Sequence, residues 1–302
     1  MEYDTFGGVY PAMCTPFADD GSIDFDRLGE HARRLERAGV DGVVPVGSTG
    51  ESATMTHDEH VEVVEAVVDA VEDVPVIAGS GSNNTEEALS LSRRSADAGA
   101  DALLLISPYY NKPEQRGLID HYETVADAVD LPQIVYNVPS RTGRNIEPET
   151  AATLAEHSNI QGYKAASGDV GQISEIVERT RDAEFDVLSG DDGLTLPIVS
   201  AGGTGCISVA ANVEPGRVGA MIHAALDGDV AEARERHHSL GPLFRAMFWE
   251  TNPIPVKAAM EIRGYSAGNL RSPLTRMSEE LYEPLEELLE TYERGEDPVD
   301  PR

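Results

Sequence analysis

Short runs of apolar residues alternate with longer amphipathic stretches over the first 230 residues of the chain. Each run is rich in Val, Ile and Leu and is bounded by turn-forming residues, which is typical of a buried strand. We predict eight strands, at residues 8–14, 42–46, 74–78, 102–106, 133–136, 160–164, 185–188 and 203–208.

The stretches between these runs repeat their apolar residues at the spacing of a helix with one buried face. Two of them begin with residues that commonly cap helices, because Thr56 is followed by Glu59 and Asn84 precedes Glu86-Glu87. We predict helices over residues 24–38, 57–72, 85–99, 114–129, 147–157, 170–181, 192–200 and 214–226.

This alternation, with a repeat of about 30 residues, favours a closed (β/α)8 barrel (TIM barrel) of the α/β class. A doubly wound open sheet is the alternative. That fold usually carries a glycine-rich phosphate turn after its first strand, whereas the segment here is Thr15-Pro16-Phe17-Ala18-Asp19. The barrel is therefore the favoured interpretation.

The alternation stops near residue 228, and only helical patterns follow, near residues 230–248, 254–263 and 278–292. We expect a catalytic barrel over residues 1–228 and a helical C-terminal region over residues 229–302. The polar tail that starts at Gly295 is predicted to be mobile.

The chain carries 54 acidic and 23 basic residues, for a formal net charge of −31 at pH 7. Such an excess of negative charge repels phosphates, so we expect neither nucleic acid nor an anionic membrane surface as a partner. The acidic residues are spread along the whole chain, which suggests a protein that works in concentrated salt. At 1 M salt the Debye length is only about 3 Å, and self-repulsion is largely screened.

The two cysteines, Cys14 and Cys206, are far apart in sequence and lie in apolar surroundings, so we expect reduced thiols in a cytoplasmic protein. The segment Met1–Thr5 lacks the basic and apolar regions of a signal peptide. No apolar run approaches the roughly 18 residues of a membrane span.

Only three of the basic residues are lysines: Lys112, Lys164 and Lys257. Lys164 ends the apolar run 160–164, just before a Gly-Asp turn, whereas the other two have no comparable position. A desolvated lysine loses its proton and attacks a carbonyl carbon to form a Schiff base, which arginine cannot do. Scarcity and position alone leave an ordinary surface lysine as an equally good interpretation.

The active site of a (β/α)8 barrel lies at the carboxyl ends of its strands. Here those ends carry the amine of Lys164, tyrosine hydroxyls, the turn Ser48-Thr49-Gly50 and the guanidinium of Arg141. An imine on the lysine acts as an electron sink, the turn offers N–H groups to a carboxylate, and the arginine clamps a second carboxylate. The set suits aldol chemistry on a keto acid. No dense His/Cys/Asp cluster accompanies it, so a metal-dependent aldolase is less favoured.

Seven motifs at these positions resemble the dihydrodipicolinate synthase family of class I pyruvate aldolases, which includes N-acetylneuraminate lyase. The resemblance covers residues 8–289 and implies condensation of pyruvate with L-aspartate 4-semialdehyde in lysine and diaminopimelate biosynthesis, with no cofactor and no metal. It also implies a homotetramer. The motifs lie at residues 47–51, 107–113, 136–143, 162–169, 189–192, 202–212 and 252–257.

The resemblance assigns roles to the matching residues. Lys164 forms the Schiff base, Tyr136 exchanges protons beside it, and Ser48 and Tyr110 complete a relay, with Tyr110 reaching in from a neighbouring subunit. Ser48 stands where the family usually has threonine; it keeps the hydroxyl but loses the β-branch that stiffens the side chain, so we expect function to be retained. The substrate contacts are Thr49 for the pyruvate carboxylate, Arg141 for that of the semialdehyde, and Gly190 and Ile207 for the pyruvate pocket.

Members of this family that are inhibited by lysine bind it between subunits, and the resemblance therefore implies lysine as a possible effector. Asn83 and Glu87, four residues apart across a predicted helix start, suit the amino and carboxylate groups of an amino acid. Solvated helix residues, or a motif inherited without inhibition, are the alternatives. The matching positions are Ser52, Ala53, His57, His60, Asn83, Glu87 and Tyr109.

Two other functions remain open from the sequence. One is another pyruvate aldolase on the same scaffold, acting on 2-keto-3-deoxygluconate or N-acetylneuraminate, and the other is a non-catalytic binding barrel. Arg141 and Tyr110 favour an aldehyde that bears a carboxylate over a sugar, whose hydroxyls call for neutral partners. The presence of Lys164 and Tyr136 speaks against a non-catalytic barrel.

Overall fold

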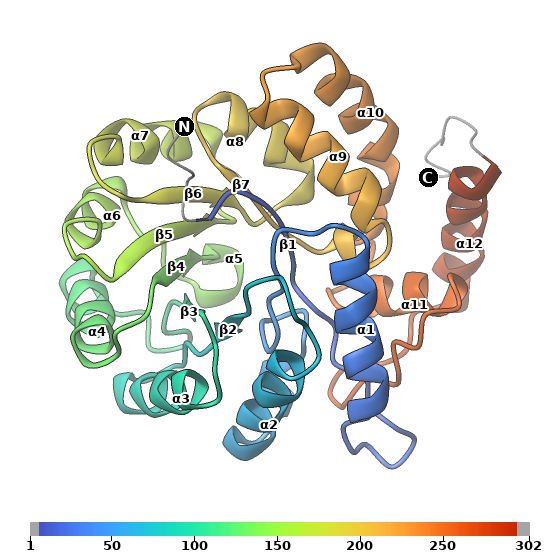
Figure 1. The fold of residues 1–302 in the computed structure, drawn as a ribbon, viewed down its shortest axis with the longest axis horizontal. Coiled ribbons are helices and arrows are strands. Elements are labelled where there is room, and N and C mark those ends of the chain that lie inside the picture. The colour runs from blue at the N-terminus through green and yellow to red at the C-terminus, as the bar shows by residue number, and fades with distance from the viewer. Residues whose placement is uncertain (1–5, 295–302) are drawn as a thin grey trace.

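Parallel strands form a curled sheet at the centre of the molecule, with helices around it (Figure 1). The computed structural model describes residues 6–294. Neighbouring strands pair in the order β1-β7-β6-β5-β4-β3-β2. The seven strands are β1 (Gly8–Pro11), β2 (Ile77–Gly79), β3 (Ala102–Ile106), β4 (Gln133–Asn137), β5 (Ile160–Ala165), β6 (Asp186–Ser189) and β7 (Gly205–Ser208).

The segment 42–46, which was predicted as the second of eight strands, lies between β1 and β2. Single parallel bridges join Val44 to Ala12 on one side and Val43 to Val76 on the other. The segment is buried, but its extended backbone ends at Val46, whose φ is +51°. It therefore closes the ring as a bridged segment and not as a full strand, and the (β/α)8 barrel is confirmed.

The strands are apolar in their middle because both of their faces are covered. Ile134 and Leu188 belong to the buried cluster that fills the barrel interior. Their neighbours Val135 and Val187 belong to a second cluster, which the surrounding helices share. Burial on both faces explains why these strands appear in the sequence as continuous apolar runs without alternation.

The helices occur at the predicted positions and are mostly a few residues shorter. Thr56 and Asn84 cap their helices as expected, since the Thr56 hydroxyl accepts from the Glu59 N–H at 3.2 Å and Asn84 Oδ1 accepts from the Glu87 N–H at 2.9 Å. The helices around the barrel are α1 (Phe25–Arg37), α2 (His57–Val68), α3 (Thr85–Asp97), α4 (Gln115–Ala128), α6 (Pro148–Leu154), α7 (Val170–Thr180), α8 (Thr195–Ser200) and α9 (Pro215–Leu226).

One short helix, α5 (Pro139–Thr142), was not predicted. Four residues are too few to show a helical period. Pro139 stands in its first turn, and Gly143, with a φ of 70°, ends it in the left-handed conformation that glycine adopts easily. This single turn carries Arg141, so it decides where the guanidinium lies.

Three C-terminal helices, α10 (Val230–Ala246), α11 (Ile254–Ile262) and α12 (Glu279–Arg294), lie along one side of the barrel in Figure 1. Leu243, Met260 and Leu288, one from each helix, belong to the same buried cluster as Val64 of α2 and Met221 of α9. These helices therefore extend the outer core of the barrel. The tail that was predicted to be mobile lies outside the described residues.

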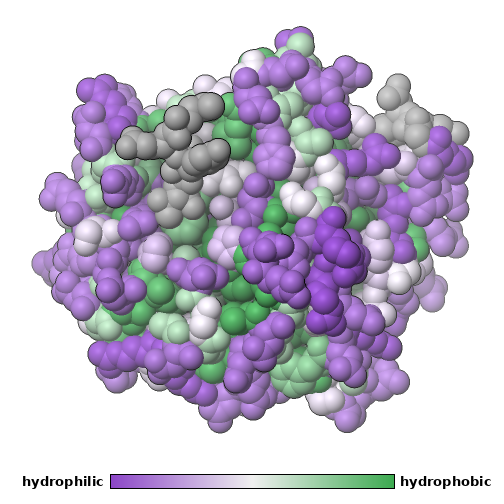
Figure 2. Space-filling model, in the orientation of Figure 1, coloured by the Kyte–Doolittle hydropathy of each residue, from purple (hydrophilic) through white to green (hydrophobic). Residues whose placement is uncertain are grey.

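Hydrophilic side chains cover most of the face shown in Figure 2, with apolar side chains gathered toward its middle. Within the part of the chain that the structure describes, no helix combines the length and the apolar character that a membrane crossing requires.

Candidate active site

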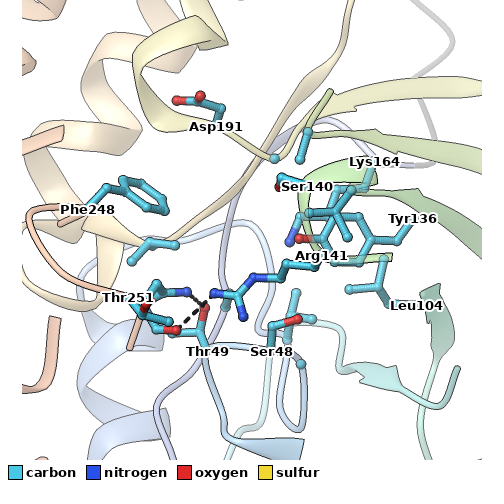
Figure 3. A pocket seen from close by; sticks show the side chains of 18 of the residues that line it. Ser48, Thr49, Leu104, Tyr136, Ser140, Arg141, Lys164, Asp191, Phe248 and Thr251 are labelled. Atoms are coloured by element: carbon cyan, nitrogen blue, oxygen red, sulfur yellow. Dashed lines mark hydrogen bonds between the residues drawn. The ribbon is translucent and has the colours of Figure 1, made fainter. Parts of the chain in front are cut away.

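A cavity of about 730 Å³ opens at the carboxyl ends of the barrel strands. Figure 3 shows Lys164 and Tyr136 on one side of it, Phe248 on the opposite side, and Arg141 extending between them. Eight residues were expected to act on or bind the substrates, and six of them line this cavity: Ser48, Thr49, Tyr136, Arg141, Lys164 and Gly190.

Lys164 lies in β5 directly beside Tyr136 of β4, its partner in the strand register. Its side chain is 6% exposed, and its Nζ is 4.2 Å from the centre of the Tyr136 ring. Burial is the largest influence on this amine and lowers its pKa to about 8, with Arg141 acting in the same direction and Cys206 and Asp192 in the opposite one. Among the described residues, no carboxylate forms an ion pair with it. Lys164 is therefore a buried amine that loses its proton easily.

The other two lysines differ from Lys164 in their surroundings. Lys257 of α11 is also buried, but its Nζ is 2.5 Å from Oε1 of Glu51 and donates to the carbonyl of Asn269 at 2.6 Å. Lys112 lies exposed on a loop. Within residues 6–294, Lys164 is the one lysine that combines burial with an amine that has no ion-pair partner and faces the cavity.

Tyr136, whose ring lies beside the Lys164 amine, brings a phenol hydroxyl to the same cavity. Burial raises the pKa of its phenol to about 12, while Arg141 and a hydrogen bond with the side chain of Ser48 act in the opposite direction. The phenol is therefore protonated at neutral pH, and Ser48 provides the next hydroxyl for a proton. This arrangement suits proton transfer to and from a group on Lys164.

The turn at residues 47–51 presents Thr49 to the cavity. The Gly50 N–H donates to the Gly47 carbonyl at 3.1 Å, and the Glu51 N–H donates to the Ser48 carbonyl at 3.2 Å. Val46 and Glu51, on either side of Gly47–Gly50, have φ angles of 51° and 59°. Non-glycine residues in this region store about 1–3 kcal/mol of strain each.

Asn252 was not recognised as a site residue from the sequence. Its Nδ2 donates to the Thr49 hydroxyl at 2.9 Å, and its carbonyl accepts from the Arg141 guanidinium at 3.0 Å. The dashed lines in Figure 3 mark these two contacts. In the sequence, Asn252 stood out only as part of the motif at residues 252–257, and that motif assigned it no role. Asn252 thus links the residues expected to hold the two substrate carboxylates.

Two neighbouring aspartates have different places. Asp191 lines the cavity, and Figure 3 shows it above Arg141. Asp192 is buried, and its Oδ2 accepts from the N–H groups of Val209 and Ala210 at 3.0 Å each. Burial, which disfavours its charged form, raises the pKa of Asp192, while these hydrogen bonds lower it. Asp192 therefore anchors the end of β7.

Gly190 lies so close to Lys164 that a larger residue would crowd the lysine side chain. A Cβ on it would be 2.9 Å from Cε of Lys164 and 3.0 Å from Cβ of Ala166. Ile207 of β7 is fully buried in the barrel interior in the same cluster as Tyr136, and it is not among the residues that line the cavity.

Tyr110 lies outside the cavity of its own chain. Its side chain is 88% exposed and its φ is 64°. Tyr109 beside it is also exposed. The structure of one chain thus does not bring Tyr110 to Lys164.

The seven positions matched to a lysine site lie around the starts of α2 and α3 and on the loop after β3. His60 is buried, its ring lies 3.3 Å from the carbonyl of Val46, and burial lowers its pKa to about 4. Glu87 accepts from the Ser82 hydroxyl at 2.7 Å, and Oδ1 of Asn83 is a buried acceptor with no hydrogen-bond partner among the described residues. Ser52 and Ala53 lie in a 3-10 turn, His57 is exposed, and Tyr109 is on the loop.

Among residues 6–294, no group of three or more His, Cys, Asp or Glu side chains is placed to hold a metal ion.

Residues 5–292 match the model of the Dihydrodipicolinate synthetase family. A 4-hydroxy-tetrahydrodipicolinate synthase of Haloarcula marismortui is 74% identical over 288 residues, covering 95% of this chain and 94% of the relative. The dihydrodipicolinate synthase of Aquifex aeolicus has a TM-score of 0.93 at 44% identity, over 97% of this chain and 99% of that one. A synthase of Cyanidioschyzon merolae solved with lysine bound has a TM-score of 0.92 at 40% identity, over 96% and 98%.

The match therefore spans nearly the whole chain in sequence and in fold. The motifs at the strand ends, from which the resemblance was inferred, lie within it. The chain belongs to the dihydrodipicolinate synthetase family.

Proposed function

We propose that the chain condenses pyruvate with L-aspartate 4-semialdehyde to 4-hydroxy-tetrahydrodipicolinate, a lyase reaction of lysine and diaminopimelate biosynthesis. The observation that carries the residue assignment is the buried amine of Lys164, which has no ion-pair partner among the described residues. Its Nζ lies 4.2 Å from the centre of the Tyr136 ring, and the residue lines the cavity. An amine with a pKa near 8 is partly neutral at physiological pH, and the neutral form is the nucleophile.

The reaction begins when the Lys164 amine attacks C2 of pyruvate, and the resulting carbinolamine loses water to give an imine. The imine withdraws electrons, so the methyl carbon C3 loses a proton and an enamine forms. C3 then attacks the aldehyde carbon of the second substrate, whose oxygen takes up a proton and becomes the hydroxyl. Finally the amino group of that substrate attacks C2, the ring closes, and Lys164 leaves as the free amine.

Tyr136 moves the protons that these steps require. Its raised pKa keeps the phenol protonated, so it begins as a donor, and the hydrogen bond with Ser48 links it to a second hydroxyl. Thr49 binds the pyruvate carboxylate, and Arg141 binds the carboxylate of the semialdehyde through paired hydrogen bonds. Gly190 leaves room for pyruvate beside Lys164, and Ile207 supports the floor of the pocket from the barrel interior.

A paired assay in concentrated salt tests this substrate assignment. Pyruvate with aspartate semialdehyde is expected to give product, whereas 2-keto-3-deoxygluconate is expected not to be cleaved. Replacing Arg141 with Gln should raise the KM for the semialdehyde and leave that for pyruvate nearly unchanged. Cleavage of the sugar acid without condensation would contradict the assignment.

We also propose a homotetramer in which the partner subunit's Tyr110 completes the proton relay. The exposed ring and left-handed backbone of Tyr110, outside its own cavity, support a contact with another copy. Two inactive variants test it: Lys164→Ala and Tyr110→Phe. If Tyr110 acts across the interface, exchanging subunits between them restores sites with an intact lysine and an intact tyrosine. If it acts within one chain, mixing restores no activity.

We also propose that lysine binds as an effector at the seven positions around the starts of α2 and α3 and on the loop after β3. Support comes from the buried Oδ1 of Asn83, which has no hydrogen-bond partner in the part of the chain that the structure describes, and from the lysine-bound relative of Cyanidioschyzon merolae. Lysine should inhibit the wild type, and Glu87→Gln should weaken that inhibition, because the carboxylate would no longer attract the ammonium group. Glu86→Gln, the same change on the exposed neighbour, is the matched control. Equal inhibition of all three proteins would exclude this site.

The enzyme is further proposed to work in the cytoplasm of a salt-rich cell. Both cysteines are buried and free, which fits a reducing compartment. The net charge of −31 and a 74% identical relative from the halophile Haloarcula marismortui support the salt-rich setting.

A further inference from the structure

The turn that carries Ser48 and Thr49 is strained at both of its ends. Val46 before it and Glu51 after it have φ angles of 51° and 59°, a region that non-glycine residues rarely occupy. Such conformations persist only where the surrounding structure holds them. What holds this turn therefore controls where Thr49 lies.

Glu51 is held by a buried ion pair. Its carboxylate is 2.5 Å from Nζ of Lys257, with the two side chains 0% and 4% exposed, and its other oxygen accepts from the Arg271 N–H at 3.0 Å. Removing two charges from water costs free energy that can exceed their attraction, so a buried ion pair is weak evidence that its role is to stabilise the fold. A role in fixing one conformation remains.

The helix α11 and the residues just before it contact the turn at two points. Asn252, just before the helix, donates to the Thr49 hydroxyl at 2.9 Å, and Lys257, within the helix, pairs with Glu51 two residues further along the turn. The Thr49 hydroxyl oxygen accepts the hydrogen bond from Asn252 Nδ2. The O–H of Thr49 therefore points elsewhere and is free to donate a hydrogen bond to a ligand.

We propose that Lys257 is a positioning residue: its ion pair with Glu51 holds the turn 47–51 so that Thr49 binds the carboxylate of pyruvate beside Lys164. The second buried lysine of the chain thus serves the substrate site without touching the substrate. This inference rests on the proposed function, because it assigns pyruvate to the Thr49 side of the cavity.

Pyruvate binding in Lys257→Met, measured by trapping the imine with borohydride over a range of pyruvate concentrations, tests the proposal. We expect the half-saturating pyruvate concentration to rise at least about tenfold, because a small displacement of a binding group has large effects. The KM for the semialdehyde should change much less. Arg263→Met is the matched control, since Arg263 is 8% exposed, follows the same helix and pairs with Glu214 and Glu293 far from the turn.

Glu51→Gln provides a second test that does not depend on the folding of Lys257→Met. It keeps the shape of the side chain and removes its charge, and it should raise the half-saturating pyruvate concentration in the same direction. Both variants and the control are compared at a temperature well below their unfolding midpoints.

The outcomes are distinct. Lys257→Met and Glu51→Gln could instead bind pyruvate as the wild type does and lose only thermal stability, the effect expected of Arg263→Met. The ion pair would then be purely structural, and the proposal would be wrong. If the wild type itself traps no pyruvate, the proposed function fails, and the positioning role fails with it.

Discussion

Two buried lysines of this chain differ because of their partners. Burial lowers the pKa of Lys257 as well, but the carboxylate of Glu51, 2.5 Å from its Nζ, opposes that shift and favours the charged ammonium. Lys164 has no such partner among the described residues, and burial lowers its pKa to about 8. The two lysines are therefore both buried, and what separates them is the ion pair that holds the ammonium of Lys257.

The lowered pKa of Lys164 gives a pH dependence. Only the neutral amine attacks pyruvate, so the rate of imine formation should rise about tenfold per pH unit below pH 8 and level off above it. Stopped-flow measurement of imine formation across this range checks the prediction. A rate that still rises above pH 10 would indicate an ordinary exposed lysine.

Removing the phenol hydroxyl tests Tyr136 as the proton relay. Tyr136→Phe keeps the ring against Lys164 but removes the group that transfers protons, so kcat should fall by about 10²–10⁴. Tyr163→Phe is a suitable control, because Tyr163 is a buried tyrosine in the same strand as Lys164 that does not line the cavity. Steady-state kinetics on both variants measure the difference, and an equal loss in the two would show a packing effect.

The sequence placed Lys164, Tyr136 and Thr49 at strand ends because each is a reactive or polar type there, and the family resemblance then gave each of them a role. Asn252 could not be placed in the same way. It contacts Thr49 across 203 residues of sequence, and its place depends on how the C-terminal region packs against the barrel. The type of residue is visible in a sequence, but a contact between distant loops is not.

The elements that position the site are short and irregular. The bridged segment 42–46 comes just before Ser48 and Thr49. The four-residue helix α5 carries Arg141. Periodic patterns need longer elements, which is why the long helices were predicted well, whereas α5 was missed and 42–46 was predicted as a full strand. Strained turns and single helical turns depend on tertiary contacts that propensity does not reveal.

The loop after β6 should be sensitive to one methyl group. In Gly190→Ala the new Cβ would be 2.9 Å from Cε of Lys164, so the lysine must shift, and we expect imine formation to slow by about 10²-fold. Gly193→Ala is the matched control on the same loop, because the nearest atom to its Cβ would be 3.4 Å away. Borohydride trapping and thermal unfolding of both variants separate loss of function from loss of fold. Normal imine formation in Gly190→Ala would show that the close approach is not required.

Over the whole molecule, the dominant property is charge. A net charge of −31 on one chain destabilises the compact state through self-repulsion unless salt screens it. Most ion pairs of the described residues lie on the surface, and each such pair contributes little to the free energy of unfolding. The fold is therefore expected to depend on ionic strength.

Thermal unfolding should respond to salt through screening. The Debye length falls from about 10 Å at 0.1 M to about 3 Å at 1 M salt, so the midpoint should rise by several degrees over that range of KCl. Sucrose at matched osmolality is the control, because it leaves charges unscreened. A midpoint that rises equally with sucrose would assign the effect to the solvent and not to charge.

The central claim is that Lys164 forms a Schiff base with pyruvate. The most direct measurement is to incubate the protein with pyruvate and borohydride, determine its intact mass, and map the modified peptide. We predict a single adduct on Lys164, and none in Lys164→Arg, whose fold is verified by circular dichroism. An adduct on Lys112 or Lys257, or an unmodified wild type, would contradict the account.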